Sequence, residues 1–229
     1  MTSSPYLPDP KRLRQRMVVE QLQGRGISDV RVLEAMARVP RHLFVPDVLW
    51  MSAYTDYPLS IGYGQTISQP FVVAFMTQEL ETRPGMSVLE IGTGSGYQAA
   101  VLSAMGLRVI TVERVPELHE SAKCRFTKLG ISNVMPKLAD GTLGWPSEAP
   151  YDRIIVTAGA PNIPSPLLKQ LADPGIMLIP VGSNRREQKF VKVVKAQQQI
   201  SAKTMGKVAF VDLIGDYGWQ DEQPAAARP

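Results

Sequence analysis

The amino-acid sequence predicts an α/β fold in which a mostly parallel sheet is flanked by helices. From residue 87 onward, short apolar segments alternate with segments of helical periodicity. A glycine-rich loop joins the first of these strands to its helix, and the last quarter of the chain has the alternation of antiparallel strands. Apolar strands that alternate with helices are typical of parallel strands buried on both faces. The prediction is completed by an N-terminal helical extension and by C-terminal antiparallel edge strands.

The length and composition suit one folded domain. The chain has 229 residues, of which 44% are hydrophobic, enough for a sizeable core. Both ends are short, polar and proline-bearing, so we expect loose tails over residues 1–10 and 219–229. The domain is expected over residues 11–218, with a helical part at 11–86 and the α/β core and C-terminal strands at 87–218.

Several classes of protein are disfavoured by the composition. No apolar run approaches the roughly 20 residues that span a bilayer, and the N-terminus lacks the apolar stretch of a secretory signal. Cys124 is the only cysteine, which excludes an intrachain disulfide and a cysteine-rich zinc site. The net charge of +4 comes from scattered segments, so nucleic-acid binding is not indicated. We expect a cytoplasmic monomer with no metal and no membrane partner.

Two helices and an irregular connection are predicted before the sheet. Leu13, Met17, Val18 and Leu22 recur at helical spacing, and "GRG" ends that helix. Ser28 or Asp29 can cap a second helix that stops before Pro40. The following segment, to residue 64, is rich in proline, glycine and aromatic residues, and we expect an ordered, packed connection.

The core elements then follow in a regular order. The expected strands are "SVLEIG", "LRVITVE", "VMPKLAD", "YDRIIVTAG" and "GIMLIPV". Helices are expected at 97–105, closed by Gly106, at 116–129, closed by Gly130, and in "PSPLLKQLA". Residues 187–215 predict an antiparallel hairpin or meander at the edge of the sheet.

The glycine loop predicts a cofactor site. "VLEIGTGSGYQAA" has the pattern strand, Gly92-x-Gly94-x-Gly96, helix, in which glycines allow a tight turn and the close approach of a ligand. The dinucleotide fingerprint would need its third glycine at Tyr97, and the Gly-Lys-Ser/Thr ending of a P-loop is absent. The alternative is an ordinary βα turn that binds nothing.

Three acidic residues near the predicted strand ends narrow the choice of cofactor. Glu90 precedes the first glycine, Glu113 ends the second strand and can accept both hydroxyls of a ribose, and Asp140 follows the third strand. An acid-lined loop suits a cofactor with a ribose, an adenine and a positive centre but no phosphates. S-adenosylmethionine has these properties. Solvated acids in ordinary turns are the alternative.

From Arg14 to Gly182 the chain resembles the protein-L-isoaspartate (D-aspartate) O-methyltransferase family. The segments that carry the resemblance are "RMVVEQL", "VLEAMARVPRHLFVP", "GYGQTISQP", "VLEIGTGSGYQAAVL", "ADGTLGWP", "PYDRIIVTAGAP" and "IMLIPVG". The resemblance implies a class I S-adenosylmethionine-dependent methyltransferase (Rossmann-like) fold. It also implies an activity: methylation of the free carboxylate of L-isoaspartyl and D-aspartyl residues in damaged proteins and peptides, which starts repair through a succinimide.

The segment "TISQP" has two compatible interpretations. In the family the Thr-Ile-Ser segment lies over the cofactor and its serine is the active-site residue, which implies this role for Ser68 here. A structural interpretation is that Ser68 or Gln69 caps a helix that begins at Pro70. A helix N-terminus also binds a carboxylate through its free N–H groups. Ser68 would hold one carboxylate oxygen, because a carboxylate with a reference pKa near 4 needs no base at pH 7.

Pattern and resemblance together predict a set of site residues, with Ser68 as the catalytic residue. Substrate contacts are expected from Thr66, Ser68 and Thr157. Cofactor contacts are expected from Thr66, Ile67, Ser68, Glu90, Gly92, Thr93, Gly94, Gly96, Glu113, Asp140 and Gly141.

Other residues leave alternatives open. The hydroxyl of Thr157 could face a substrate or bond to the backbone, and Tyr54, Asp56 and Tyr63 could line a peptide groove or simply pack. Trp145 could cover an adenine or belong to the core. Asp212 stands where the family pattern leads us to expect proline, which bears on the C-terminal lobe.

Three other functions stay possible at this point. A methyltransferase of the same fold could act on a different carboxylate, a small molecule or a dedicated peptide, as the Asp212 departure would allow. A module that binds S-adenosylmethionine without catalysis is less compatible with Ser68 and the three acids. A nicotinamide dehydrogenase is disfavoured by Tyr97.

Overall fold

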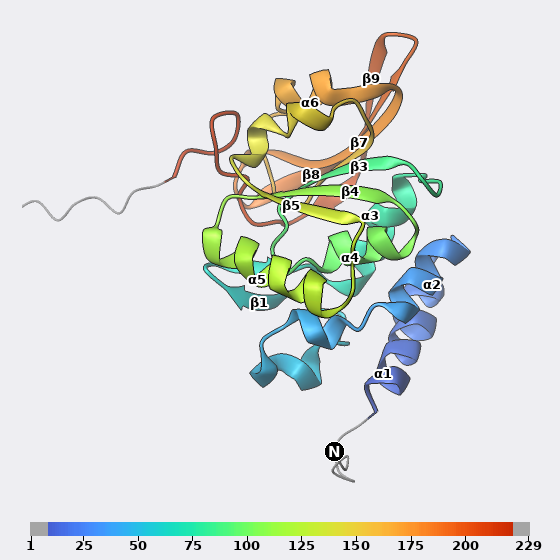
Figure 1. The fold of residues 1–229 in the computed structure, drawn as a ribbon. Helices are drawn as coiled ribbons and strands as arrows, with labels where there is room; N and C mark the ends of the chain where they lie inside the picture. Colours follow the sequence, from blue (N-terminus) through green and yellow to red (C-terminus); the bar gives the residue numbers. More distant parts are fainter. Residues whose placement is uncertain (1–8, 222–229) are drawn as a thin grey trace, which may run out of the picture.

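A seven-stranded sheet forms the centre of the protein (Figure 1). The computed structural model describes residues 9–221. The strand order is β5-β4-β3-β6-β7-β8-β9. The strands are β3 (Ser87–Ile91), β4 (Arg108–Glu113), β5 (Val134–Leu138), β6 (Tyr151–Val156), β7 (Leu171–Asn184), β8 (Glu187–Ala196) and β9 (Gln199–Val208). Strands β3 to β7 pair in parallel, whereas β8 pairs antiparallel with both of its neighbours. The expected parallel sheet with antiparallel edge strands is confirmed.

Helices cover both faces of this sheet. Helices α3 (Pro70–Glu79), α4 (Tyr97–Ala104) and α5 (Pro116–Lys128) lie on one face, and α6 (Ser165–Gln170) lies on the other (Figure 1). Alternate residues of the central strands therefore belong to two separate buried clusters. Val88 and Ile155 pack with the larger group of helices, and Leu89 and Ile154 pack toward α6.

The N-terminal extension packs on the helix-rich face. Helix α1 (Pro10–Arg16) is capped by Asp9, whose carboxylate accepts from the amide of Lys11. It continues through a π-helical turn (Met17–Leu22) and a 3₁₀ turn (Gln23–Arg25) to Gly26, which has a left-handed conformation. Helix α2 (Val30–Arg38) is capped by Asp29 and contacts α3 and α4. Both predicted helices are confirmed, and the π-helical turn was not foreseen.

The connection before α3 contains a small hairpin that the sequence analysis did not anticipate. After two 3₁₀ helices (Arg41–Phe44 and Asp47–Ser52), strands β1 (Leu59–Gly62) and β2 (Gln65–Ile67) pair antiparallel. Tyr63 and Gly64, between them, both have positive φ, at 53° and 69°. A two-residue loop of this kind matches the twist of the strands it joins. Two of the three residues of "TIS", Thr66 and Ile67, thus lie in a strand that ends just before α3.

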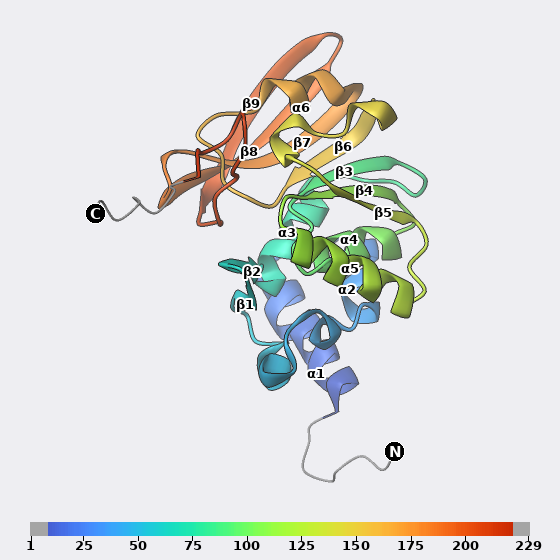
Figure 2. The same ribbon diagram turned by 60° about the vertical axis from the view of Figure 1, so that its left-hand side comes forward.

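The last residues cross the carboxyl ends of the parallel strands. After β9, main-chain hydrogen bonds join Val211 and Leu213 to Gly159, and Trp219 Nε1 donates to the carbonyl oxygen of Gly159 (3.0 Å). In Figure 2 this segment and the β1–β2 hairpin lie on the same side of the molecule. Short 3₁₀ turns at Gly141–Leu143 and Pro146–Glu148 complete the elements.

The predicted tails need correction where the structure describes them. Asp9 and Pro10 begin α1, and residues 219–221 make specific contacts with the core, such as the ion pair of Arg114 with Asp221. These residues are held by side chains that lie far away in the sequence, which a composition-based boundary does not detect. The other residues of both expected tails, 1–8 and 222–229, lie outside the described part of the chain.

No helix among residues 9–221 combines the length and the apolar character that crossing a membrane requires.

Candidate active site

The glycine loop turns from β3 into α4 in a conformation that other residues rarely adopt. Gly92, Gly94 and Gly96 all have positive φ, at 98°, 52° and 86°. A Cβ on Gly92 would lie 2.5 Å from Thr157 Oγ1, and one on Gly96 would lie 2.7 Å from the ring of Phe126. At Gly92 and Gly96 the loop therefore lies too close to Thr157 and to Phe126 of α5 for a side chain, whereas at Gly94 the positive φ is the constraint.

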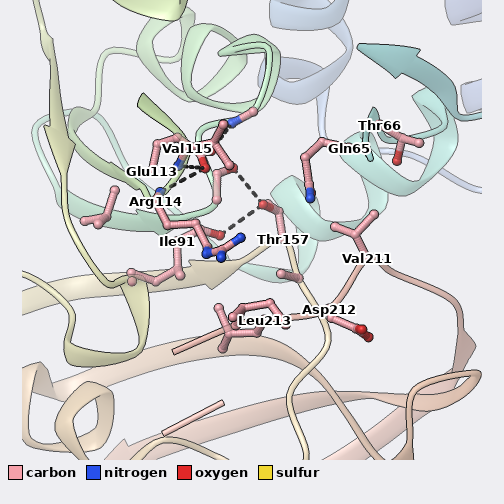
Figure 3. A pocket seen from close by; sticks show the side chains of 16 residues that line it. Gln65, Thr66, Ile91, Glu113, Arg114, Val115, Thr157, Val211, Asp212 and Leu213 are labelled. Atoms are coloured by element: carbon pink, nitrogen blue, oxygen red, sulfur yellow. Dashed lines mark hydrogen bonds between the residues drawn. The ribbon is translucent and has the colours of Figure 1, made fainter. Parts of the chain in front are cut away.

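Glu113, at the end of β4, fixes this loop. Its Oε2 accepts from the amide of Gly94 (2.9 Å), and its Oε1 accepts from the amides of Arg114 and Val115 (2.9 Å each). A carboxylate has about four lone-pair positions, so one is left for a ligand. Figure 3 shows Glu113 at the edge of a cavity, with its hydrogen bonds to these loops drawn.

The cavity lies between the glycine loop, the β1–β2 hairpin and the C-terminal segment. Six separate segments of the chain meet in its wall. They contribute Gln65, Thr66, Ile91, Gly92, Gly94, Val112, Glu113, Arg114, Val115, Gly141, Thr157, Ala158, Val211, Asp212, Leu213 and Ile214 (Figure 3).

A second depression, which we call the acceptor groove, adjoins the cavity. It is lined by Pro58, Thr66, Ser68, Gln69, Val72, Thr157 and residues 207–211. Thr66, Thr157 and Val211 line both the groove and the cavity. The cavity and the groove therefore meet at these three residues, and ligands bound in them would lie next to each other.

The structure brings half of the predicted cofactor and substrate residues to the cavity. Thr66, Gly92, Gly94, Glu113, Gly141 and Thr157 line it. Ser68 lies in the acceptor groove instead. Ile67 is buried in the core, the hydroxyl of Thr93 pairs with that of Thr111 (2.7 Å), and Gly96 packs against Phe126.

Glu90 lies in the core and not in the cavity wall. Its side chain is fully buried on β3, next to Thr111 of β4 and Ile155 of β6, and neither carboxylate oxygen has a hydrogen bond of normal geometry. Burial raises the pKa of Glu90 to about 8; the nearby hydroxyl of Thr111 opposes this rise and the charge of Glu113 adds to it. The raised pKa favours the neutral form of Glu90 at pH 7, and its side chain does not line the cavity.

The carboxylate of Asp140 is also used elsewhere. Oδ1 accepts from the amide and the hydroxyl of Thr142 (2.8 and 2.7 Å), and Oδ2 accepts from the amide of Asp216 (2.8 Å). Asp140 thus holds the C-terminal segment to the turn after β5, and the residue that reaches the cavity is its neighbour Gly141. Of the three acids expected around the cofactor, Glu113 lines the cavity, and Glu90 and Asp140 do not.

Ser68 does not cap α3. Gln69 occupies the N-cap position, but its side chain makes no capping hydrogen bond. The carboxylate of Asp56 caps the helix instead: it accepts from the amide of Phe71 (3.3 Å) and from Gln69 Nε2 (2.6 Å). Within residues 9–221 the half-buried Ser68 hydroxyl has no hydrogen-bond partner at all. The cap interpretation is wrong for Ser68, whereas Gln69 does hold the N-cap position. The Ser68 hydroxyl is left available to a ligand in the acceptor groove.

Both alternatives for Thr157, a place at the site and a hydrogen bond to the backbone, are found in the structure. It lines the cavity and the groove, yet its hydroxyl donates to the main-chain oxygens of Ile91 and Gly92 (3.0 and 2.8 Å). The oxygen can still accept a hydrogen bond from a ligand, but its proton is already engaged.

The other candidate residues pack outside the cavity. Tyr54 is buried with its hydroxyl 2.7 Å from His42 Nδ1, Asp56 holds α3, and Tyr63 is exposed in the hairpin turn. Trp145 packs under Lys137, and Cys124 is exposed on α5. None of them lines the cavity.

Sequence reasoning missed the contribution of the C-terminal segment to the cavity. Residues 211–214 form one wall, and no motif marks them. The Asp212 carboxylate points away from Thr157 in Figure 3 and pairs with Arg185 (2.7 Å). Gln65 was also missed, although it directly precedes Thr66 in the segment "GYGQTISQP".

Comparisons with known proteins identify the family. A family model described as protein-L-isoaspartate(D-aspartate) O-methyltransferase matches residues 13–218. The chain is 53% identical over 210 residues to protein-L-isoaspartate O-methyltransferase 1 of Syntrophobacter fumaroxidans, a match that covers 92% of this chain and 98% of that protein. It is 50% identical over 215 residues to the protein-L-isoaspartate O-methyltransferase of Methanoculleus marisnigri, covering 93% and 97% of the two chains.

Solved structures agree with this result. A protein-L-isoaspartate O-methyltransferase superposes with a TM-score of 0.81 at 30% identity, covering 89% of this chain and 67% of that chain. The structure of a β-aspartate methyltransferase from Plasmodium falciparum, in complex with S-adenosyl-L-homocysteine, has a TM-score of 0.76 at 26% identity, covering 88% and 98%. The chain belongs to the protein-L-isoaspartate(D-aspartate) O-methyltransferase family.

Proposed function

We propose that the protein transfers a methyl group from S-adenosylmethionine to the free carboxylate of L-isoaspartyl and D-aspartyl residues in damaged proteins and peptides. The observation that carries this proposal is the contact between the cavity and the acceptor groove, which share Thr66, Thr157 and Val211. The activity named for relatives at about 50% identity and the S-adenosyl-L-homocysteine complex of a structural neighbour support it.

The residues of the cavity fit this cofactor. Glu113 presents a carboxylate at a strand end, where its remaining lone pair can accept from a ribose hydroxyl. Ile91, Val112 and Leu213 offer apolar walls. Arg114, the single basic residue in the wall, is paired with Asp221, so the site offers no unpaired cation for a phosphate. We propose Gly92, Gly94, Glu113 and Gly141 as cofactor-binding residues.

The acceptor groove fits a carboxylate that needs orientation more than activation. An aspartyl-type carboxylate has a reference pKa near 4 and is ionised at pH 7, so a general base is not required. No histidine, aspartate or glutamate lines the groove. Ser68 can donate its hydroxyl proton to one carboxylate oxygen and leave the other directed at the cavity.

The bound cofactor would supply a methyl group on a positively charged sulfur. The protein's part is to hold the carboxylate in line with that methyl group and to exclude water from the pair, because positioning supplies much of the rate enhancement in such a displacement. Thr66 and Thr157, at the boundary of cavity and groove, lie where the two reactants would meet. The methyl ester gives a good leaving group, and closure to a succinimide uses the substrate's own backbone nitrogen.

The direct test compares two synthetic peptides that differ only in one isoaspartyl or aspartyl residue. Radiolabelled S-adenosylmethionine reports methyl transfer to each. We expect labelling of the isoaspartyl peptide and none of its aspartyl twin. Equal labelling, or no labelling of either, would reject the proposal.

Two further properties belong to this proposal. We propose that residues 11–218 act as one domain, in agreement with the family match over residues 13–218. We also propose a cytoplasmic monomer, which size-exclusion chromatography and fractionation of cells would test.

A further inference from the structure

A third depression continues from the acceptor groove, and the activity proposed above does not use it. We call it the apolar hollow. It lies between α3 and strands β8 and β9. Most of its wall residues are aromatic or aliphatic, and a few are polar. The lining residues are Arg25, Gln69, Phe71, Val72, Phe75, Met76, Phe190, Met205, Gly206, Lys207 and Val208.

The hollow and the groove share part of their walls. Gln69, Val72, Lys207 and Val208 line both, so the two depressions are continuous. From Val72 to Phe75 and Met76 is about one turn of α3, a rise of roughly 5 Å. An extended peptide advances about 3.3 Å per residue. A peptide whose carboxylate lies at Ser68 would therefore bring a side chain one or two residues away over the hollow.

Aromatic rings build the floor of the hollow. Phe71 and Phe75 stack with ring centroids 6.0 Å apart and an angle of 18° between the ring planes, and Phe75 also contacts Phe190 (5.8 Å). Phe71, Phe75 and Met205 are only partly buried, so the floor faces outward. A Met side chain adapts its shape to different apolar ligands.

The hollow is held in place by a polar network on its rim. The guanidinium of Arg25 lies 3.7 Å above the ring of Phe71. Arg25 also pairs with Asp56, which in turn holds Gln69 and the amide of Phe71. The same carboxylate thus fixes the start of α3 beside Ser68 and one wall of the hollow, so the two are positioned together.

We infer that the apolar hollow is a specificity subsite, which binds a large apolar side chain of the substrate one or two residues from the isoaspartyl residue. The inference rests on the proposed function, because binding of the isoaspartyl carboxylate in the acceptor groove determines which neighbouring residue of the substrate reaches the hollow. Burial of an aromatic or long aliphatic side chain on this floor contributes affinity in proportion to the apolar area covered.

The experiment uses a set of isoaspartyl peptides that are identical except at the two residues on each side of the isoaspartyl residue. Each of these four positions carries alanine or phenylalanine in turn, and kcat/KM is measured for methyl transfer. For one position we expect phenylalanine to raise kcat/KM about tenfold over alanine, mainly through a lower KM, in line with the discrimination an apolar pocket provides.

Variants place the effect in the hollow. Met205→Asp and Phe75→Ala should each bring the phenylalanine-to-alanine ratio of kcat/KM close to one. Ile200→Asp is the matched control: Ile200 is an exposed apolar residue of the same strand β9 but outside the hollow, and the ratio should stay near ten. The ratio is independent of how much folded enzyme each preparation contains.

Each other outcome would overturn the inference. Equal kcat/KM for all peptides would refute the subsite while leaving methylation of the alanine peptide, and with it the proposed function, intact. A preference that survives in Met205→Asp and Phe75→Ala would place the subsite elsewhere. A dimer that Met205→Asp dissociates would assign the hollow to a second copy of this chain. Failure to methylate any isoaspartyl peptide would reject the proposed function and the subsite together.

Discussion

Glu113 Oε2 lies 2.9 Å from the backbone nitrogen of Gly94, which ties the end of β4 to the loop that follows β3. The Glu113 side chain thereby connects the C-terminal ends of two neighbouring parallel strands, β3 and β4. Ligands of open α/β sheets bind at this end of the strands. The carboxylate makes two further bonds to the amides of Arg114 and Val115. Glu113 is thus both a structural support of the cavity and the acid that faces it.

Glu113→Gln should weaken binding of the cofactor product. In glutamine an amide nitrogen replaces one carboxylate oxygen, so a donor would face a backbone N–H that now has an acceptor. The negative charge is also lost, and a hydrogen bond to a charged group is worth about 1.5–3 kcal/mol. We expect an increase of about 10- to 100-fold in the Kd of S-adenosyl-L-homocysteine, measured by calorimetry. Glu117→Gln, an exposed position at the start of α5, is the control and should leave the Kd unchanged. A normal Kd for Glu113→Gln would show that the carboxylate serves the loops alone.

Ser68→Ala should separate catalysis from cofactor binding. Ser68 lies in the acceptor groove and not in the cavity wall, so the substitution removes a donor to the substrate only. We expect kcat to fall by about 10- to 100-fold, because a hydrogen bond to a charged group is lost, with the Kd of S-adenosyl-L-homocysteine changed less than twofold. Ser60→Ala, in the neighbouring strand β1, should behave as wild type. An undiminished kcat in Ser68→Ala would exclude Ser68 from the reaction.

Gly92→Ala should destabilise the protein through two separate effects. Its φ of 98° is left-handed, which costs other residues about 1–2 kcal/mol, and the new Cβ would lie 2.5 Å from Thr157 Oγ1. Gly26→Ala isolates the first effect, since Gly26 has a φ of 94° and nothing within 4 Å of its Cβ position. In a chain of this size about 1 kcal/mol corresponds to about 2–4 °C in Tm. We expect a clearly lower Tm for Gly92→Ala than for Gly26→Ala; equal values would mean that Thr157 moves aside freely.

Glu90→Gln should gain stability over the wild type as the pH rises. The pKa of Glu90 is raised to about 8 by burial, above an ordinary value of 4.5, so between these values the folded state holds a proton that the unfolded state has lost. The contribution of the Glu90 proton to the free energy of unfolding is fully present below about pH 4.5. It declines as the pH rises to about 8 and does not change further above that pH.

Glutamine at position 90 has no such dependence. The stability difference in favour of Glu90→Gln should therefore grow by on the order of 1 kcal/mol per pH unit across this window. Urea unfolding at pH 5, 6, 7 and 8 measures it. Glu148→Gln, at an exposed position, serves as the control. Parallel curves for Glu90→Gln and wild type would mean that Glu90 is charged in the folded state.

Local patterns were sufficient to predict the core of the fold. Helix α4 begins at Tyr97 and α5 at Pro116, as expected, because glycine and proline mark these ends in the sequence itself. The central strands β3, β4 and β6 were predictable for a similar reason, since burial on both faces requires continuous apolar runs. The glycine loop and Glu113 followed from their places at strand ends.

Features that depend on distant contacts were not predictable. The role of Asp140 is set by the amide of Asp216, and the capping of α3 is set by Asp56, thirteen residues before Gln69. The β1–β2 hairpin depends on positive φ at Tyr63, a residue type that gives no signal for such a turn. Glu90 and Glu113 are both acids at the end of a strand, and only the packing around Glu90 distinguishes the core residue from the cavity residue.

The wall formed by residues 211–214 has a consequence for synthesis. The glycine loop leaves the ribosome more than a hundred residues before this wall (211 − 96 = 115). The cavity therefore cannot be completed until residues 211–214 have been made, and a premature stop before Val211 would leave it without this wall. The methyl donor can be fully enclosed only once residues 211–214 have emerged and closed the cavity.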